Sequence, residues 1–344
     1  MRRFFCALLA LALFAIPAFA EGDAFSISQD STAFSMETAF SILQLAAPQT
    51  ADAARALFEG MGFSVLRQAN YAKRVSNHSN TSAYTVAAGQ AEIRGETRTL
   101  VVITIRGTAD GEWYSNFDFA GETGGACLYA ENFMAAAQAI FDAAQPDIDS
   151  YQNPVVLATG YSRGAACANL LGVLLDAAYD PADVYVYTFA TPNTVHTADV
   201  DCPNIFNLVN MNDAITRMPP AAWGFHRAGV DIELRDPDNT NAGMHEMFLA
   251  LLGACPDIDS YYNDRHSLTA PGLSEDGIAF FELFQAVADA FTNGTPSAET
   301  QALFQQIMTG QSDMAAFFSL FMGTSQTSFF DQHMPTVYMN LMGE

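Results

Sequence analysis

The sequence predicts an α/β fold: a central, mostly parallel sheet with helices on both of its faces. Short runs of apolar and β-branched residues alternate along the chain with longer segments in which apolar residues recur at helical spacing. This alternation is typical of strand–helix–strand units. The strand-like runs are almost continuously apolar, as expected for strands that are buried on both faces. Half of the 344 residues are hydrophobic, which is enough for a large core and argues against disorder.

The predicted elements follow in chain order. Residues 35–61 are expected to form two helices separated at Pro48, because their apolar residues recur every three or four positions. The later runs predict strands at Ala83–Ala88, Thr99–Ile105, Val155–Ala158, Val184–Phe189 and Ile205–Val209, and helices at Tyr129–Ala144 and Ala165–Ala178. Gly229–Leu234 is expected to be an edge strand, and 236–325 a mostly helical insertion.

The charge of the chain excludes some classes of partner. Lys and Arg number 14 against 38 Asp and Glu, so the formal net charge is −24. Binding to nucleic acid requires clustered cations, and an anionic membrane surface repels an acidic chain. No run of basic residues here is longer than two. Neither a Cys-x-x-Cys nor a His-x-x-x-His spacing occurs, so we expect neither a metal site nor a cofactor.

The first 20 residues have the pattern of a secretory signal peptide. Arg2 and Arg3 precede the apolar run 4–16, and Ala18–Ala20 forms a small-residue cleavage site. The alternative, a membrane anchor, needs about 20 apolar residues to cross the bilayer, and this run is shorter. The sequence therefore predicts cleavage, one mature domain at 21–344 without a stable membrane span, and a secreted, cell-surface or periplasmic protein.

Export permits disulfides between the four cysteines of the mature chain, which are Cys127, Cys167, Cys202 and Cys255. Four cysteines allow three pairings. Cys202 and Cys255 are each followed by proline in loop-like sequence. These two are the candidates for a pair, and two free thiols are the alternative.

The sharpest local signal is Gly-Tyr-Ser-Arg-Gly at Gly160–Gly164, between a predicted strand and a predicted helix. A serine on a tight strand-to-helix turn needs small residues at both flanks, because the turn lies close to the neighbouring strand and helix. The following helix directs backbone N–H groups and its positive dipole end toward a developing oxyanion. The pattern also occurs in ordinary turns, but its position between strand and helix favours Ser162 as a nucleophile.

A nucleophilic serine on such a turn requires an acid and then a histidine later in the chain. Asp213 follows the predicted strand at 205–209 and is the candidate acid. Asp199 and Asp201 are weaker candidates because they precede that strand. A loop or helix-cap carboxylate is the alternative interpretation of Asp213.

The candidate base must come after the acid. Four histidines do so: His226, His245, His266 and His333. His333 stands near the C-terminus, where a closing loop would return its imidazole to the active edge of the sheet. Spacing alone leaves His333 and His266 level.

Several segments resemble a known family. They are Val101–Thr108 with Glu112–Phe119, the turn at Gly160–Gly164, Phe189–Pro192 and Asn212–Pro220. They resemble segments of the class 3 lipases, an α/β-hydrolase family, in the same order along the chain. The first pair resembles the strand and Trp-containing acidic loop of that family, and the other three resemble its nucleophile turn, the end of its next strand and its acid motif. His333–Tyr338 is similar to the closing histidine segment of that family, and His266 is not. The resemblance spans about residues 35–220 and 331–341.

The resemblance implies an α/β-hydrolase fold and a catalytic triad of Ser162, Asp213 and His333. It also implies an oxyanion hole formed by the backbone N–H and hydroxyl of Thr108 and by the backbone N–H of Arg163. Two features depart from the family. Arg163 stands where the family often has Leu, which we expect to make the pocket mouth more polar, and the acid and the base are 120 residues apart, a longer span than expected.

The implied function is that of an exported serine carboxylic ester hydrolase. Such an enzyme cleaves acylglycerols or other acyl esters through an acyl-enzyme intermediate. A lipid surface is a candidate transient partner. The alternatives are a triad hydrolase of aryl esters, thioesters or peptides, because the turn alone does not determine the bond cleaved, and a catalytically silent binding protein. Residues 273–325, rich in Phe and Met, have two interpretations: a helical layer beside the sheet, or a cap over Ser162.

Overall fold

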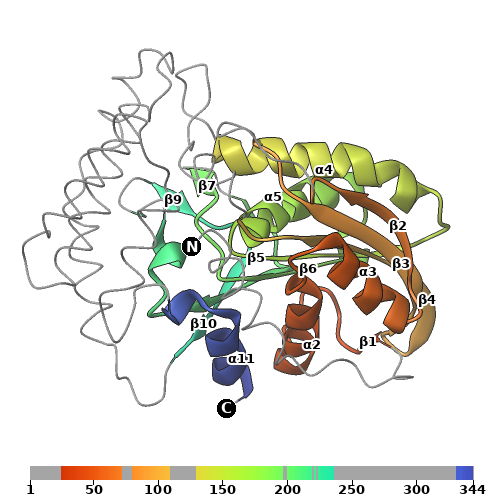
Figure 1. Ribbon diagram of the computed structural model, residues 1–344, viewed down its shortest axis with the longest axis horizontal. Coiled ribbons are helices and arrows are strands. Elements are labelled where there is room, and N and C mark those ends of the chain that lie inside the picture. Colours follow the sequence, from red (N-terminus) through yellow and green to blue (C-terminus); the bar gives the residue numbers. More distant parts are fainter. Residues whose placement is uncertain are drawn as a thin grey trace, which may run out of the picture.

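The computed structural model describes residues 25–71, 80–108, 129–196, 200–218, 221, 224–235 and 331–343. The described residues form a central sheet between two layers of helices (Figure 1). The predicted signal peptide at 1–20 and the predicted insertion at 236–325 lie outside them, so both stay predictions. No helix in the described part of the chain combines the length and apolarity needed to cross a membrane.

The described strands form an eight-stranded, mostly parallel sheet. They are β1 (Ser26–Ile27), β2 (Ser64–Ala69), β3 (Tyr84–Ile93), β4 (Glu96–Ile105), β5 (Val155–Tyr161), β6 (Val184–Phe189), β8 (Ile205–Asn210) and β10 (Val230–Leu234). Their order is β1, β3, β4, β5, β6, β8, β10, with β2 paired to β3. All neighbours from β4 to β10 are parallel. The carboxyl ends of β5 and β8 therefore lie at the same edge of the sheet.

A two-residue turn makes β3 and β4 antiparallel. Arg94 and Gly95 connect the two strands with φ angles of 53° and 78°, the left-handed conformation that two-residue hairpin turns require. β4 begins at Glu96, earlier than the predicted start at Thr99. Its first residues are polar and partly exposed, so they lack the apolar run on which the prediction depends. The short strand β2 and the separate pair β7 (Val195–His196) and β9 (Phe225–His226) are not predicted from the sequence.

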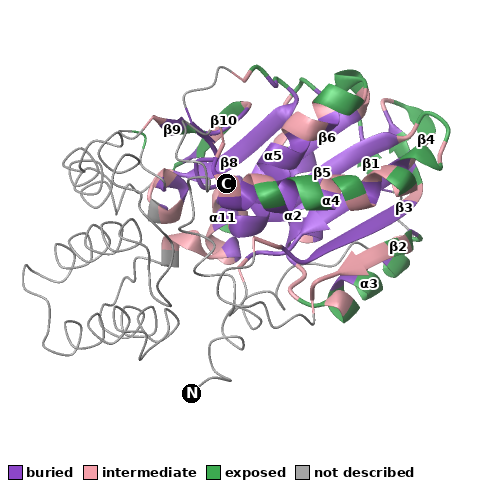
Figure 2. Cartoon of the chain, turned by 90° about the horizontal axis from the view of Figure 1, so that it is seen from above, coloured by how far each residue is buried: buried purple, intermediate pink, exposed green. Residues whose placement is uncertain are grey.

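Helices cover both faces of the sheet, and the strands between them are buried (Figure 2). One face carries α4 (Glu131–Asp149) and α5 (Arg163–Ala178), and the other carries α2 (Met36–Ala46), α3 (Ala51–Gly60) and α11 (Pro335–Gly343). Along β5, Val156 and Ala158 join the core under α4 and α5, whereas Val155, Leu157 and Tyr161 join the core under α2 and α11. The predicted arrangement of sheet and helices is confirmed.

Candidate active site

The candidate nucleophile lies at the carboxyl end of β5. Ser162 follows Tyr161, the last residue of that strand, and directly precedes α5. Its φ is 56° and its ψ is −124°, a region that residues other than glycine rarely enter. Such strain persists only where the surrounding structure holds it, and it is concentrated at functional sites. The predicted strand-to-helix turn is therefore present, with Ser162 at its strained centre.

Two glycines allow this turn to pack closely. A Cβ atom on Gly160 would overlap the backbone of Gly164 and lie 2.8 Å from the nitrogen of Ala165. A Cβ atom on Gly164 would overlap the carbonyl oxygen of Ile105 and lie 2.7 Å from that of Arg106. Neither position has room for a side chain, because the turn is pressed between the end of β4 and the start of α5.

Ser162, His333 and Asp213 form one hydrogen-bonded chain. Ser162 Oγ lies 2.8 Å from His333 Nε2, and His333 Nδ1 lies 2.7 Å from Asp213 Oδ2. The side chain of Asp213 is fully buried, and that of His333 is 15% exposed, which leaves the imidazole accessible from one side. The structure thus brings together the three residues named from the resemblance, although the acid and the base are 120 residues apart.

Asp213 accepts hydrogen bonds through both of its oxygens. Oδ1 accepts from the backbone N–H of Ile215 at 3.0 Å and so caps the short helix η3 (Ala214–Arg217). Oδ2 accepts from the Tyr338 hydroxyl at 2.7 Å as well as from His333. Burial and the negative charge of Asp213 raise the pKa of Tyr338 well above its usual value, so this phenol stays a donor. The helix-cap interpretation and the contact with histidine are both correct for this residue.

The segment that carries His333 is tied to the sheet by two side chains. His333 ends the short helix η5 (Asp331–His333), and α11 follows it. The Tyr161 hydroxyl donates to the backbone carbonyl of His333 at 2.7 Å. Asn210 Nδ2 donates to the backbone carbonyl of Gln332 at 3.0 Å and to its Oε1 at 2.9 Å. The base is therefore anchored from the ends of both β5 and β8.

The segment that leads to Thr108 lies beside the nucleophile turn. Ile105, the last residue of β4, pairs with Gly160 near the end of β5. A Cβ atom on Gly107 would lie 3.2 Å from the carbonyl oxygen of Tyr161, which shows how closely the two segments approach. This places Thr108 at the edge of the sheet where the oxyanion donors are expected. The acidic loop that follows Thr108 lies outside the described residues.

Residues 102–223 match the family model described as Lipase (class 3). The match supports the predicted resemblance to the class 3 lipase family over this segment of the chain. It also supports the predicted serine ester hydrolase. The matched segment contains Ser162 and Asp213, and His333 lies beyond it.

Solved structures of fungal lipases are similar to this chain over part of their length. The triacylglyceride lipase of Rhizomucor miehei is 18% identical over 61% of this chain and 84% of its own, with a TM-score of 0.45. The native propeptide complex of the Rhizomucor miehei lipase is 17% identical over 67% of this chain and 81% of its own, with a TM-score of 0.44. A lipase from Rhizopus microsporus var. chinensis is 18% identical over 64% and 80%, with a TM-score of 0.42.

The expectation that the Arg163 side chain makes the pocket mouth more polar is wrong. Arg163 is 1% exposed. Its Nε donates to Ser82 Oγ at 3.2 Å, and its Nη2 donates to the backbone carbonyl of Thr81 at 3.4 Å. The guanidinium carbon lies 5.6 Å from the centre of the Phe133 ring on α4. The first turn of α5 directs this side chain into the core beside α4, and the backbone N–H stays at the helix N-terminus.

Among the described residues, the rivals Asp201 and His226 do not take part in this chain of hydrogen bonds. Asp201 and His226 are exposed. Asp199, His245 and His266 lie outside the described residues.

Of the two cysteines that are candidates for a disulfide, Cys202 is a buried thiol. Burial, followed by the charge of Asp176, raises the pKa of Cys202 to about 12, so the thiol stays protonated at neutral pH. Cys255, its candidate partner, lies outside the described residues.

Sequence reasoning does not identify the roles of Tyr161, Tyr338 and Asn210. Tyr161 directly precedes the nucleophile and Tyr338 lies within the closing histidine segment, but position alone does not specify a contact. The Tyr338 hydroxyl reaches an acid 125 residues earlier, and the Tyr161 hydroxyl reaches a carbonyl 172 residues later. Only the folded chain shows these partners.

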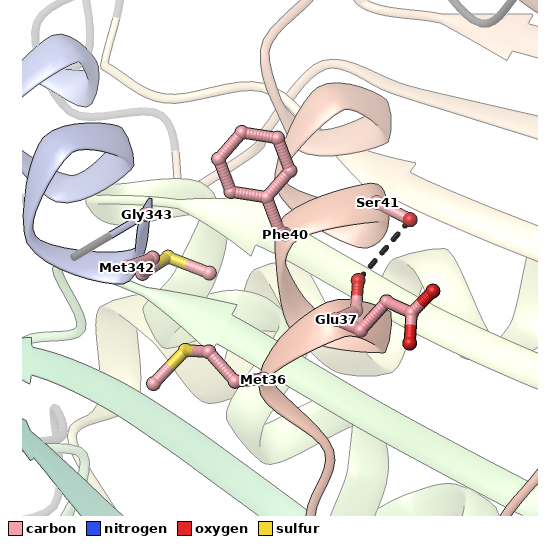
Figure 3. A pocket seen from close by; sticks show the side chains of 6 residues that line it. All are labelled: Met36, Glu37, Phe40, Ser41, Met342 and Gly343. Carbon is pink, nitrogen blue, oxygen red and sulfur yellow. Dashed lines mark hydrogen bonds between the residues drawn. The ribbon is translucent and has the colours of Figure 1, made fainter.

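A hollow between α2 and α11 lies apart from the triad. It is lined by Met36, Glu37, Phe40, Ser41, Met342 and Gly343 (Figure 3). The Ser41 hydroxyl turns back to the backbone carbonyl of Glu37 at 3.2 Å. Since Ser162, Asp213 and His333 do not line this hollow, it is not where an ester would meet the candidate nucleophile.

Proposed function

We propose that this lipase-family protein hydrolyses carboxylic acyl esters, acylglycerols among them, through a covalent acyl-enzyme on Ser162. The observation that supports this most strongly is the hydrogen-bonded chain from Ser162 through His333 to the buried Asp213. Serine is a weak nucleophile at neutral pH and needs an adjacent base that is oriented by a third group. Both partners lie at hydrogen-bonding distance at the carboxyl edge of the sheet.

In the first half of the reaction, Ser162 Oγ attacks the ester carbonyl while His333 Nε2 takes its proton. Asp213 stabilises the imidazolium that forms, through the hydrogen bond to Nδ1. The negative oxygen binds the backbone N–H and hydroxyl of Thr108 and the backbone N–H of Arg163, at the positive end of α5. His333 then donates the proton to the leaving alcohol, and the acyl group stays on Ser162.

In the second half, a water molecule replaces the alcohol. His333 Nε2 takes a proton from this water as its oxygen attacks the acyl-enzyme carbonyl. The same donors hold the second oxyanion, and collapse returns the proton to Ser162 Oγ. The carboxylic acid leaves and the triad is restored.

The first experiment treats the purified mature protein with a fluorophosphonate probe and maps the modified residue by mass spectrometry. We expect stoichiometric labelling at Ser162 that is lost in Ser162→Ala and His333→Ala. Ser41→Ala, which changes a serine of α2 outside the triad, serves as the matched control and should label normally. A folded wild-type protein that does not label contradicts an activated serine and favours the silent binding protein.

A substrate panel then tests the ester class. The panel contains acylglycerols and methyl esters of increasing acyl chain length, an aryl ester, a thioester and a peptide. We expect the highest kcat/KM for an acylglycerol or another acyl ester. A clear preference for the aryl ester, the thioester or the peptide would keep the triad and replace the proposed substrate.

We also propose that the chain is exported with removal of residues 1–20, which the N-terminal sequence pattern supports. Expression of the full chain in an exporting host, followed by N-terminal sequencing of the secreted protein, tests this. A mature chain that begins at Glu21 is expected. A chain retained in the cytoplasm with residues 1–20 still attached would contradict the proposal.

A further inference from the structure

We propose that Tyr161 is a positioning residue that holds the base His333 at hydrogen-bonding distance from the nucleophile; this inference rests on the proposed function. Tyr161 directly precedes Ser162 in the chain. Its hydroxyl donates to the backbone carbonyl of His333 at 2.7 Å. One turn of the chain therefore carries both the nucleophile and an anchor for the base.

The packing around Tyr161 supports this role. The alternation along β5 places its ring in the core under α2 and α11. The ring centre lies 5.7 Å from that of the His333 imidazole, and 5.6 Å from that of Tyr338 in an edge-on contact at 79°. Tyr338 in turn donates to Asp213. Tyr161 thus contacts the base directly and is also linked to the acid through Tyr338.

The Tyr161 hydroxyl keeps its proton and remains a hydrogen-bond donor. The residue is 5% exposed, and burial together with the charge of Asp213 raises its pKa well above the usual value for a phenol. A buried hydroxyl that keeps its proton needs an acceptor, and the carbonyl of His333 provides it. The hydrogen bond is therefore present throughout the pH range in which an imidazole acts as a base.

The hydrogen bonds from Asn210 to Gln332 do not replace the hydrogen bond from Tyr161 to His333. Asn210 holds Gln332, the residue before the base, whereas Tyr161 holds the carbonyl of His333 itself. The imidazole follows its own backbone, so a shift of this carbonyl lengthens the 2.8 Å contact between Nε2 and Ser162 Oγ. A misplacement of about 1 Å can reduce an enzymatic rate about a hundredfold.

The test compares Tyr161→Phe with Tyr185→Phe in the full mature protein. The matched control removes a hydroxyl that donates to the backbone carbonyl of Gln29 at 2.9 Å, from a buried ring on β6 away from the triad. For Tyr161→Phe we expect kcat to fall about tenfold to a hundredfold, KM to stay within about twofold, and fluorophosphonate labelling of Ser162 to slow by the same factor as kcat. Tyr185→Phe should keep the wild-type kcat and labelling rate.

Two results would overturn the inference. One is a Tyr161→Phe protein with wild-type kcat and labelling rate; the other is an equal loss of kcat in both variants. If Tyr161→Phe does not fold, Tyr161→Met provides the same comparison, because its flexible apolar side chain also removes the bond to His333 and leaves no unpaired polar atom in the core.

A readout that does not depend on turnover separates this inference from the proposed function. The Nδ1 proton of His333, in its short bond to Asp213, is expected to give a far-downfield proton NMR signal. We expect this signal to shift or broaden in Tyr161→Phe and to stay unchanged in Tyr185→Phe. If wild-type protein cleaves no ester, the proposed function fails, and an unchanged signal in Tyr161→Phe would refute the positioning role independently.

Discussion

At the scale of single residues, Asp213 shows how a buried carboxylate is accommodated. It accepts hydrogen bonds from its own loop at Ile215, from His333 and from Tyr338. A buried charge is tolerated only where such donors replace water. The same three bonds fix the rotation of the carboxylate and hence the orientation of the imidazole. The two side-chain donors, His333 and Tyr338, can each be removed by a single substitution.

The first prediction concerns Tyr338→Phe. Removing this hydroxyl deprives Asp213 Oδ2 of one donor and the backbone N–H of Asn210 of its acceptor. We expect the free energy of unfolding to fall by about 1.5–3 kcal/mol, the usual contribution of a hydrogen bond to a charged group, and kcat to fall about tenfold. Urea unfolding and ester kinetics measure both. Tyr185→Phe is the control, and an unchanged kcat in Tyr338→Phe would show that the phenol does not orient the acid.

The second prediction concerns the oxyanion donors. Thr108→Ala removes a hydroxyl donor and is expected to lower kcat about 10² to 10³-fold, the usual effect of losing one such group. Thr108→Ser keeps the hydroxyl and should largely preserve kcat. Steady-state kinetics on one ester measure both variants. An equal loss in the two would limit the contribution of Thr108 to its backbone N–H.

At the scale of elements, the site is built where β4, β5 and β8 end. Parallel pairing brings the carboxyl ends of these strands to one edge, and short segments after each strand carry Thr108, Ser162 and Asp213. The turn after β5 is the tightest of the three, because α5 begins directly after Ser162. Glycine at both flanks makes this geometry possible.

The third prediction compares two glycine substitutions. Gly164→Ala places a Cβ atom against the carbonyl oxygens of Ile105 and Arg106. We expect the free energy of unfolding to fall by about 1–3 kcal/mol, as for other overpacked sites, and labelling of Ser162 to be lost. Gly60→Ala, at the end of α3 with nothing within 4 Å of the new Cβ, should be neutral or stabilising by up to about 1 kcal/mol. Equal stability of the two variants would contradict the close packing of the turn.

At the scale of the whole molecule, many phenols are buried between the two helical layers and the sheet. Burial is the largest cause that raises the pKa of Tyr71, Tyr84, Tyr161, Tyr185, Tyr187 and Tyr338. Burial also raises the pKa of the Cys202 thiol to about 12. These groups keep their protons in the folded chain at pH values where an unfolded chain loses them.

The fourth prediction follows from this difference in bound protons. Below about pH 8 the phenols are protonated in both states and do not affect the pH dependence. Above about pH 10 the unfolded chain releases protons that the folded chain retains, so stability falls by about 1.4 kcal/mol per pH unit for each such phenol. Urea unfolding between pH 8 and pH 11 measures the slope. Tyr187→Phe should give a shallower slope, and phenols that ionise near pH 10 in the folded protein would contradict the prediction.

The elements of the described core are largely predictable because their signals are local. The strand β6 and the helix pair at 35–61 match the predicted positions, and β5 and α5 differ from theirs only at their ends. The hairpin of β3 and β4 is missed as a pairing, since its two-residue turn at Arg94 and Gly95 carries a weak signal. The inward direction of Arg163 is also missed, because it depends on how α5 packs against α4.

Local sequence patterns are enough to predict the chain order of the main strands and helices, the strand-to-helix turn at Ser162 and the candidate acid Asp213, because periodicity and turn chemistry act over a few neighbouring residues. Only the resemblance to a family separated His333 from His266, since spacing treats them alike. The tertiary structure is needed to see that the Tyr161 hydroxyl holds the candidate base and the Tyr338 hydroxyl holds the candidate acid. The Tyr161 and Tyr338 contacts join residues 172 and 125 positions apart, and such contacts exist only once the sheet brings its strand ends to one edge.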